Sequence, residues 1–322
     1  MKKILFIIMC VVAFSCFVSC ADVTSQDDAK LDIVCTSFAP YDWVKNIVKD
    51  SENVNLTLLN RKGTDIHSYE PSADDIITIS ECDILIATGG SGDKWALDTV
   101  SQLENATAVN LLELTDSHGN HGELLSHDHD SQCEHSHVDS AETADEHIWM
   151  SLKNAVFFAE EITEIICSKD EENSELYKNN CNNYVNLLKQ LDAEFEAKVS
   201  SSKNPVMVVA DRFPFLYLTN DYGIECFAAF PGCSADTDAS PDTVIRLSEA
   251  VDEHNLSFIA VTENTTGKTA KAVIDNTKDK NQQIVVIDSM QAVSEKDMEN
   301  GVTYLGTMKK NLDAIKMLLE TE

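Results

Sequence analysis

Residues 31–60 read LDIVCTSFAPYDWVKNIVKDSENVNLTLLN, and this stretch decides the fold class. Residues 31–38 form a short apolar run, residues 41–50 follow with an amphipathic pattern, and residues 54–60 are again strand-like. A strand, a helix and a second strand in this order are typical of the βαβ unit, whose two strands run parallel. The stretch therefore predicts an α/β protein.

The same alternation continues on both sides of a long helical segment at residues 148–203. Apolar side chains recur there at three- and four-residue steps, and the polar stretch 168–175 predicts a break between two helices. We predict two lobes, each a parallel-type sheet flanked by helices, at residues 31–147 and 204–322, joined by the helical segment. Further strands are expected at 83–88, 206–210, 224–230, 257–262 and 283–287, and helices at 72–81, 94–103, 214–221, 241–254, 266–276 and 303–320.

The chain is strongly acidic. Its 322 residues include 55 Asp+Glu against 24 Lys+Arg, a formal net charge of −31 at pH 7. Such a charge repels phosphate backbones and excludes nucleic-acid binding through a basic surface. Beyond the first twenty residues no apolar run is long enough to cross a bilayer, which excludes a polytopic membrane protein.

The amino terminus has the pattern of a bacterial export signal. Two lysines precede a short apolar stretch, so we expect residues 1–19 to be a signal peptide. Residues 17–20 (FVSC) resemble the lipobox of bacterial lipoproteins, with Phe where Leu is usual. Cys20 is therefore the candidate lipidation site and residues 20–30 a polar tether. The predicted location is extracytoplasmic, anchored by lipid to the outer face of the bacterial cell membrane.

Seven of the ten cysteines remain once Cys20 and the two in the signal are set aside. None forms a CxxC pair, which argues against a cysteine-based zinc site. Disulfides can form in an exported chain. The candidates are Cys226 with Cys233 or Cys167 with Cys181, and an odd total leaves at least one free thiol.

Residues 115–146 form a low-complexity tract in which histidines alternate with carboxylates and almost nothing is apolar. Neutral imidazoles and carboxylate oxygens together suit borderline divalent cations. The tract cannot bury a core, so we expect it to capture metal as an accessory site rather than to form a rigid one. Its candidate ligands are His118, His121, His127, His129, His135 and His137.

Two further segments present a histidine where α/β folds bind ligands. GTDIHSYEP, at residues 63–71, carries His67 on a glycine-started loop after a predicted strand, at the carboxyl edge of the sheet. DEHIW, at residues 145–149, carries His147 where the tract gives way to the helical segment.

Together with EHIWMS, DKW, VVIDS and the closing residues 304–313, these segments resemble the metal-binding receptors of bacterial ABC importers for zinc and manganese, the cluster A-I solute-binding proteins. The likeness covers essentially residues 31–320. It implies two α/β lobes connected by one long helix, with the metal in the cleft between them. It also implies that His67 and His147 are ligands from the amino-terminal lobe and Asp288 a ligand from the carboxyl-terminal lobe.

The remaining ligand of this family, His in zinc receptors and Glu in manganese receptors, precedes a Tyr-Gly pair. Counting back from Gly223, its place falls on Arg212. A guanidinium has no acceptor and stays charged, so Arg212 cannot ligate a cation. Either Asp211 takes over, which we favour, or three protein ligands are completed by water or a loop histidine.

Two imidazoles with one or two carboxylates suit Zn²⁺, whereas Mn²⁺ prefers more oxygen. A His-rich loop also marks the zinc-type members of this family. The resemblance therefore implies a receptor, not an enzyme, that delivers Zn²⁺ to an ABC permease and its ATPase and touches the membrane only through its lipid anchor. A manganese receptor and a zinc-binding adhesin or storage protein on the same fold are the alternatives.

The alternative from another class is a metallohydrolase, because two histidines, carboxylates and an open position also form a catalytic arrangement. Glu146 and Glu70 are its candidate general bases, but neither lies in a known hydrolytic motif, and neither GxSxG nor HExxH occurs. GGSG, at residues 89–92, lacks the GKS/T of a P-loop and fits a tight strand-to-helix turn.

Overall fold

The amino-terminal lobe is a parallel sheet flanked by helices. The computed structural model describes residues 30–117, 145–230 and 239–320 of the chain, and Leu31–Glu322 forms one compact unit. The elements of this lobe are β1 (Leu31–Cys35), α2 (Phe38–Ile47), β2 (Val54–Leu58), the 3-10 helix η1 (Ile66–Ser68), α3 (Ala73–Ser80), β3 (Ile84–Ala87), α4 (Gly90–Val100), β4 (Thr107–Asn110) and α5 (Leu111–Ser117). The strand order is β2-β1-β3-β4, and every strand pair is parallel.

The carboxyl-terminal lobe repeats this architecture, with the strand order β6-β5-β7-β8 and every strand pair parallel. Its strands are β5 (Val206–Val209), β6 (Glu225–Ala228), β7 (Phe258–Thr262) and β8 (Gln283–Ile287). Its helices are α8 (Leu216–Tyr222), α9 (Pro241–Glu253), α10 (Lys268–Asn276), α11 (Glu295–Glu299) and α12 (Tyr304–Leu318).

The strand order creates a crevice in each sheet. In the amino-terminal lobe the order reverses between β1 and β3, and in the carboxyl-terminal lobe between β5 and β7. Chain segments leave the sheet in opposite directions at such a switch point, so the carboxyl ends of these strands are where open α/β sheets bind ligands. The residues that follow β1, β3, β5 and β7 therefore lie where a ligand would bind.

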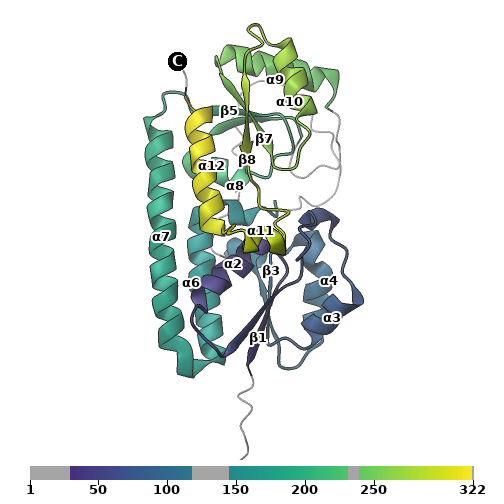
Figure 1. Cartoon of the computed structure of the whole chain (residues 1–322), viewed down its shortest axis with the longest axis vertical. Coiled ribbons are helices and arrows are strands. Elements are labelled where there is room, and N and C mark those ends of the chain that lie inside the picture. The colour runs from purple at the N-terminus through teal and green to yellow at the C-terminus, as the bar shows by residue number, and fades with distance from the viewer. Residues whose placement is uncertain (1–29, 118–144, 231–238, 321–322) are drawn as a thin grey trace, which may run out of the picture. The chain divides into compact units, whose positions relative to one another are not determined.

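Two long helices connect the lobes. The 3-10 turn η2 (Ile148–Met150) precedes α6 (Leu152–Lys169), and α7 (Ser174–Ser201) packs against α6 along its length (Figure 1). The break that the polar stretch predicted falls at Asp170, whose backbone leaves the helical region with φ −134° and ψ 74°. Its carboxylate accepts hydrogen bonds from Tyr177 Oη at 2.6 Å and from Asn53 Nδ2 at 2.9 Å. With 28 residues, α7 is about 42 Å long, and it contacts α2, α8 and α12.

One apolar cluster joins both lobes to these helices. Trp43 of α2 is fully buried, with its ring 5.7 Å from that of Phe158 in α6 and edge-on to Tyr304 of α12 at 5.3 Å. Beside it, the Asp42 carboxylate accepts the backbone N–H of Tyr304 at 3.1 Å. Elements from both halves of the chain thus share one core.

We predict that Asp42→Asn stabilises the protein at neutral pH. Burial raises the pKa of Asp42 to about 6, against the opposing effect of the Tyr304 N–H. Between pH 4 and 6 the folded state keeps a proton that the unfolded state has lost, so stability falls as pH rises through this window. The amide should remove this cost, raising the free energy of unfolding by about 2 kcal/mol at pH 7.5 and by much less at pH 4. Thermal melts at both pH values measure it.

The exposed Asp275, replaced by Asn, is the matched control and should show no pH-dependent gain. A gain for Asp42→Asn of equal size at pH 4 and pH 7.5 would contradict the interpretation, since protonation would then have no part in it.

Most of the predicted elements are present within one to four residues of their expected bounds. Ser240 caps α9 as expected, accepting the N–H of Thr243 at 3.1 Å. The prediction missed β4, α5 and α11, and α4 begins at Gly90 rather than near residue 94. None of the helices in the described part of the chain combines the length and apolar character that a bilayer crossing needs.

One predicted disulfide is wrong. Cys167 and Cys181 are both free thiols, and each faces a backbone carbonyl: Sγ lies 3.6 Å from Ser174 O in one case and 3.4 Å from Ala159 O in the other. Cys226 is also free, and its candidate partner Cys233 lies outside the described residues. The signal peptide, Cys20 and the six histidines of the tract likewise fall outside the described ranges.

Candidate metal centre

His67 lies in a loop that follows β2 and crosses the carboxyl edge of the amino-terminal sheet. Asn60 closes the loop, because its amide oxygen accepts the N–H of Thr64 at 3.1 Å and its amide nitrogen donates to the carbonyl of the same residue. Asp65 then caps η1 by accepting the backbone N–H of His67 at 3.0 Å. Side chains within the loop therefore fix the backbone position from which the His67 side chain extends.

His147 is buried, with 2 % of its surface exposed, immediately before η2. The Asp145 carboxylate accepts both its backbone N–H at 2.9 Å and its ring Nδ1–H at 2.7 Å. Burial alone would raise the pKa of Asp145, but the hydrogen bonds and charge of His147 hold it below its usual value. With Nδ1 protonated toward a carboxylate, the ring's lone pair lies on Nε2, which is how metal-binding histidines are oriented.

The structure brings the two predicted histidines together. His67 Nε2 lies 3.2 Å from His147 Nε2, and the ring centroids are 5.2 Å apart. Zinc–nitrogen bonds of about 2.0–2.1 Å at a tetrahedral angle would place two ligand nitrogens about 3.4 Å apart. The observed spacing thus matches a shared cation within a few tenths of an ångström.

Glu146 contacts the histidine pair on the side of α4. One of its carboxylate oxygens lies 3.6 Å from His67 Nδ1, and the other accepts the backbone N–H of Ser91 at 2.7 Å, at the start of α4. Gly90 has a φ of +75°, and a Cβ on it would overlap the Glu146 carboxylate. The GGSG stretch is thus a strand-to-helix turn, as expected, whose glycine admits this carboxylate.

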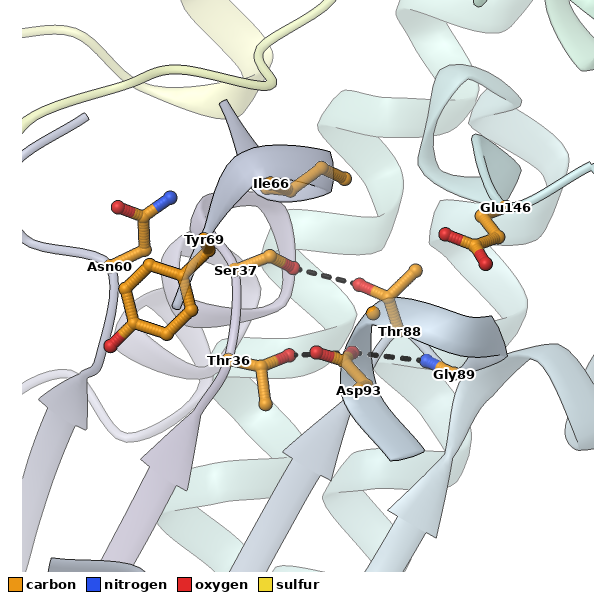
Figure 2. Close-up of a pocket in the computed structure, with 10 residues that line it drawn as sticks. Thr36, Ser37, Asn60, Ile66, Tyr69, Thr88, Gly89, Asp93 and Glu146 are labelled. Carbon is orange, nitrogen blue, oxygen red and sulfur yellow. Dashed lines mark hydrogen bonds between the residues drawn. The ribbon is translucent and has the colours of Figure 1, made fainter. Parts of the chain in front are cut away.

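A recess at the β1/β3 switch point, about 370 Å³ with the solvent at its mouth included, is lined by Ile66 and Glu146, the sequence neighbours of the two histidines (Figure 2). In its lining, the Thr36 hydroxyl donates to Asp93 Oδ2 at 2.9 Å, and the Gly89 N–H donates to the same oxygen at 3.1 Å. Burial raises the pKa of Asp93 to about 6, although these hydrogen bonds oppose the rise. Asp93 therefore fixes the turn on which Glu146 rests.

Asp288 follows β8, and its side chain accepts the N–H of Met290 at 2.8 Å. Burial raises the pKa of this carboxyl above its usual value. The next residue, Ser289, accepts the Trp149 indole N–H at 2.9 Å, and the Trp149 ring lies edge-on to His147 with centroids 5.2 Å apart. The end of β8 is thus tied to the segment that carries His147.

Asp211 follows β5 and is engaged within its own lobe. One oxygen accepts the hydroxyl of Thr262 at 2.8 Å, and the other accepts the N–H of Arg212 at 2.9 Å. In residues 30–117, 145–230 and 239–320, no three or more His, Cys, Asp or Glu are grouped as a metal site requires. The structure joins His67 to His147 and leaves Asp211 and Asp288 apart from them.

Sequence reasoning missed the supporting residues. Nothing in it assigned Asp145 to His147, although a carboxylate two positions before a candidate ligand is a usable signal. The ion pair between Arg212 and Asp65 joins residues 147 positions apart, and no local pattern indicates it.

Two α/β lobes joined by long helices, with paired imidazoles at a sheet edge, are the arrangement that the sequence predicted for a metal-binding receptor. The family model described as zinc-uptake complex component A, periplasmic, matches residues 33–318, and the chain belongs to that family. Its members are metal-binding receptors rather than enzymes, which confirms the class predicted from the sequence.

Curated relatives are named as zinc-binding or zinc-uptake proteins. The zinc-binding lipoprotein AdcA of Streptococcus pneumoniae (strain ATCC BAA-255 / R6) is 27 % identical over 325 residues, which is 100 % of this chain and 62 % of that protein. The high-affinity zinc uptake system protein ZnuA of Bacillus subtilis (strain 168) is 27 % identical over 292 residues, covering 89 % of this chain and 87 % of that protein. The chain therefore spans less than two thirds of the pneumococcal relative.

Solved structures confirm the predicted fold. The Zn(II)-bound ZnuA-like domain of Streptococcus pneumoniae AdcA superposes with a TM-score of 0.70 at 24 % identity, over 91 % of this chain and 100 % of that one. A Mn-bound periplasmic metal binding protein from Candidatus Liberibacter asiaticus superposes with a TM-score of 0.69 at 21 % identity, over 90 % and 100 % of the two chains. Because one neighbour holds zinc and the other manganese, the fold does not decide the metal.

Proposed function

We propose that this protein is an extracytoplasmic high-affinity receptor that binds Zn²⁺ between its lobes and delivers it to an ABC permease and its ATPase. The observation that carries the proposal is the 3.2 Å separation of the His67 and His147 Nε2 atoms. Membership in a zinc-uptake family and the names of the relatives support the transport role. Binding, not catalysis, is the activity.

In this proposal His67, His147 and Asp288 are protein ligands to the transported ion. Asp288 would have to move toward the histidines from the end of β8, which Trp149 ties to the His147 segment. Asp211 remains the favoured fourth ligand, and to bind it must give up the hydrogen bond from Thr262. Water or a histidine of the tract is the other way to complete four-coordination.

Zinc is favoured over manganese by the donor atoms. Two imidazole nitrogens at tetrahedral spacing suit Zn²⁺, whereas Mn²⁺ is best served by a majority of oxygen ligands. Protons compete for both nitrogens, so zinc should be released as pH falls below about 6. The supply of neutral imidazole, rather than a redox or covalent step, would set the affinity.

The proposed location follows from the export signal and from the relatives. Cleavage before Cys20 would leave an acylated cysteine as the only membrane attachment. The pneumococcal relative is named a lipoprotein, which supports this reading. The permease and its ATPase are then partners that meet the receptor at the outer face of the membrane.

The His-rich tract is proposed to collect Zn²⁺ at low affinity beside the central site. Calorimetric titration of the mature chain and of a variant lacking residues 118–142 tests the two kinds of site together. We expect one tight zinc per chain in both proteins, with the weaker sites lost from the deletion variant. Loss of the tight site on deletion would contradict the proposal, because the centre would then lie in the tract.

A further inference from the structure

The loop that carries His67 is held by the carboxyl-terminal lobe as well as by its own. Just before the histidine, Lys62 pairs with Ser294 in an isolated antiparallel bridge, and the Glu295 N–H donates to the carbonyl of Arg61 at 2.8 Å. Gly63 can pack against this segment of the carboxyl-terminal lobe only because it lacks a side chain. A Cβ there would lie 2.9 Å from the backbone carbonyl of Ala292.

A second contact reaches the loop much closer to the histidine. Arg212 Nη1 donates to Asp65 Oδ2 at 2.9 Å, while Asp65 Oδ1 accepts the backbone N–H of His67 at 3.0 Å. A single carboxylate therefore connects a guanidinium of the carboxyl-terminal lobe to the turn of a predicted ligand. The two side chains are 32 % and 24 % exposed, so solvent screens this pair less than a fully exposed one.

The backbone of Arg212 is held in place within the carboxyl-terminal lobe. Its backbone N–H donates to Asp211 Oδ1 at 2.9 Å, and Asp211 Oδ2 is bound by Thr262 at the end of the neighbouring strand β7. The guanidinium thus extends from the sheet edge of one lobe to the loop of the other.

We propose that Arg212 is a positioning residue for the metal centre: through Asp65 it fixes the turn that carries His67. Ligand loops bind well only when held within about 0.5 Å of the productive geometry, and a charge-assisted hydrogen bond is a strong way to hold one. This role also explains how a guanidinium is tolerated beside a cation site, because Asp65 neutralises it. The inference rests on the proposed zinc-binding function.

The test uses Arg212→Met, Asp65→Asn and the double variant, all in the chain lacking residues 118–142 so that the tract contributes no zinc. Zinc chloride is titrated against a chromophoric chelator, and dissociation is followed by stopped flow. Each single variant should bind zinc about fivefold more weakly, mostly through faster dissociation, and the double variant should be no weaker than the singles. Arg212→Lys should restore part of the loss.

The control is Arg246→Met, which removes the same charge from the same lobe, where Arg246 contacts the carbonyl of Ala228. It should leave zinc affinity unchanged. Cobalt substitution adds a second readout, because a displaced His67 should alter the visible absorption of bound Co²⁺ in Arg212→Met and not in the control. Should Arg212→Met fail to fold, Asp65→Asn and Arg212→Lys make the same comparison.

Unchanged zinc affinity in both single variants, or single-variant effects that simply multiply in the double variant, would overturn the positioning role. The proposed function fails separately. If the parent chain binds no stoichiometric zinc, or if His67→Ala binds it as well as the parent, the receptor proposal is wrong whatever Arg212 does.

Discussion

Replacing His147 with alanine should lower zinc affinity at least about 100-fold. Mutating the residues that merely support a metal ligand typically costs 10- to 100-fold, so removing a ligand should cost more. His147 is also the buried member of the pair, with its Nδ1 committed to Asp145 and its Nε2 facing His67. Water cannot replace it at equal strength, because an imidazole fixed by its surroundings binds without paying the entropy of ordering. Equilibrium competition in the chain lacking residues 118–142 is the measurement.

The remaining histidine of the described ranges supplies the control. His254 lies at the end of α9, where its Nδ1 accepts a hydrogen bond from Asn204 Nδ2 at 3.0 Å and its ring packs on Phe227. His254→Ala should bind zinc as the parent does. If His147→Ala keeps parental affinity while remaining folded by circular dichroism, the pair described above is not the metal centre.

Asp145→Asn should weaken zinc binding about 10- to 100-fold, the range seen when the carboxylate partner of a metal-binding histidine is removed. The negative charge makes the His147 ring a stronger donor and fixes which nitrogen carries the proton. An amide keeps the shape of the carboxylate but can present either a donor or an acceptor to Nδ1, so the ring loses its enforced tautomer. Competition titration again gives the affinity.

Asp98→Asn is the matched change for this variant. It removes one negative charge from the same lobe, at an exposed position where Asp98 pairs with Lys94 at 3.0 Å. Zinc affinity should stay at the parental value there. Equal losses in the two variants would show that net charge, rather than the Asp145–His147 hydrogen bond, governs binding.

The fold was predictable wherever buried strands read as apolar runs. The run ILIA became β3 because a parallel strand covered on both faces selects such residues. The run QIVVI became the edge strand β8, in which only Val285 and Ile287 are buried. The strand TAVN was missed because half of it is polar and only Val109 is buried, and the helix LLELTDS was hidden beside the His-rich tract. The glycines at residues 89–90 indicated a turn correctly but not that a helix starts on the second of them.

The site was predictable only in part, for a physical reason. His67 and His147 stand in motifs, so the sequence marks them directly. The residues that orient them act through contacts made after folding: Glu146 reaches the start of α4, and Arg212 reaches Asp65 from the other lobe. Single-sequence patterns describe neighbours along the chain and cannot register such pairs.

In the proposed receptor, the shared aromatic core would limit how a bound ion leaves. Swinging the lobes apart as rigid halves would pull Trp43 away from Phe158 and Tyr304 and expose an apolar interior to water. Loosening one short crossing loop disturbs far less buried surface. Metal exchange should therefore proceed by local opening of the loop at residues 60–69 rather than by separation of the lobes. Its rate would be set by the few polar contacts that hold this loop in place.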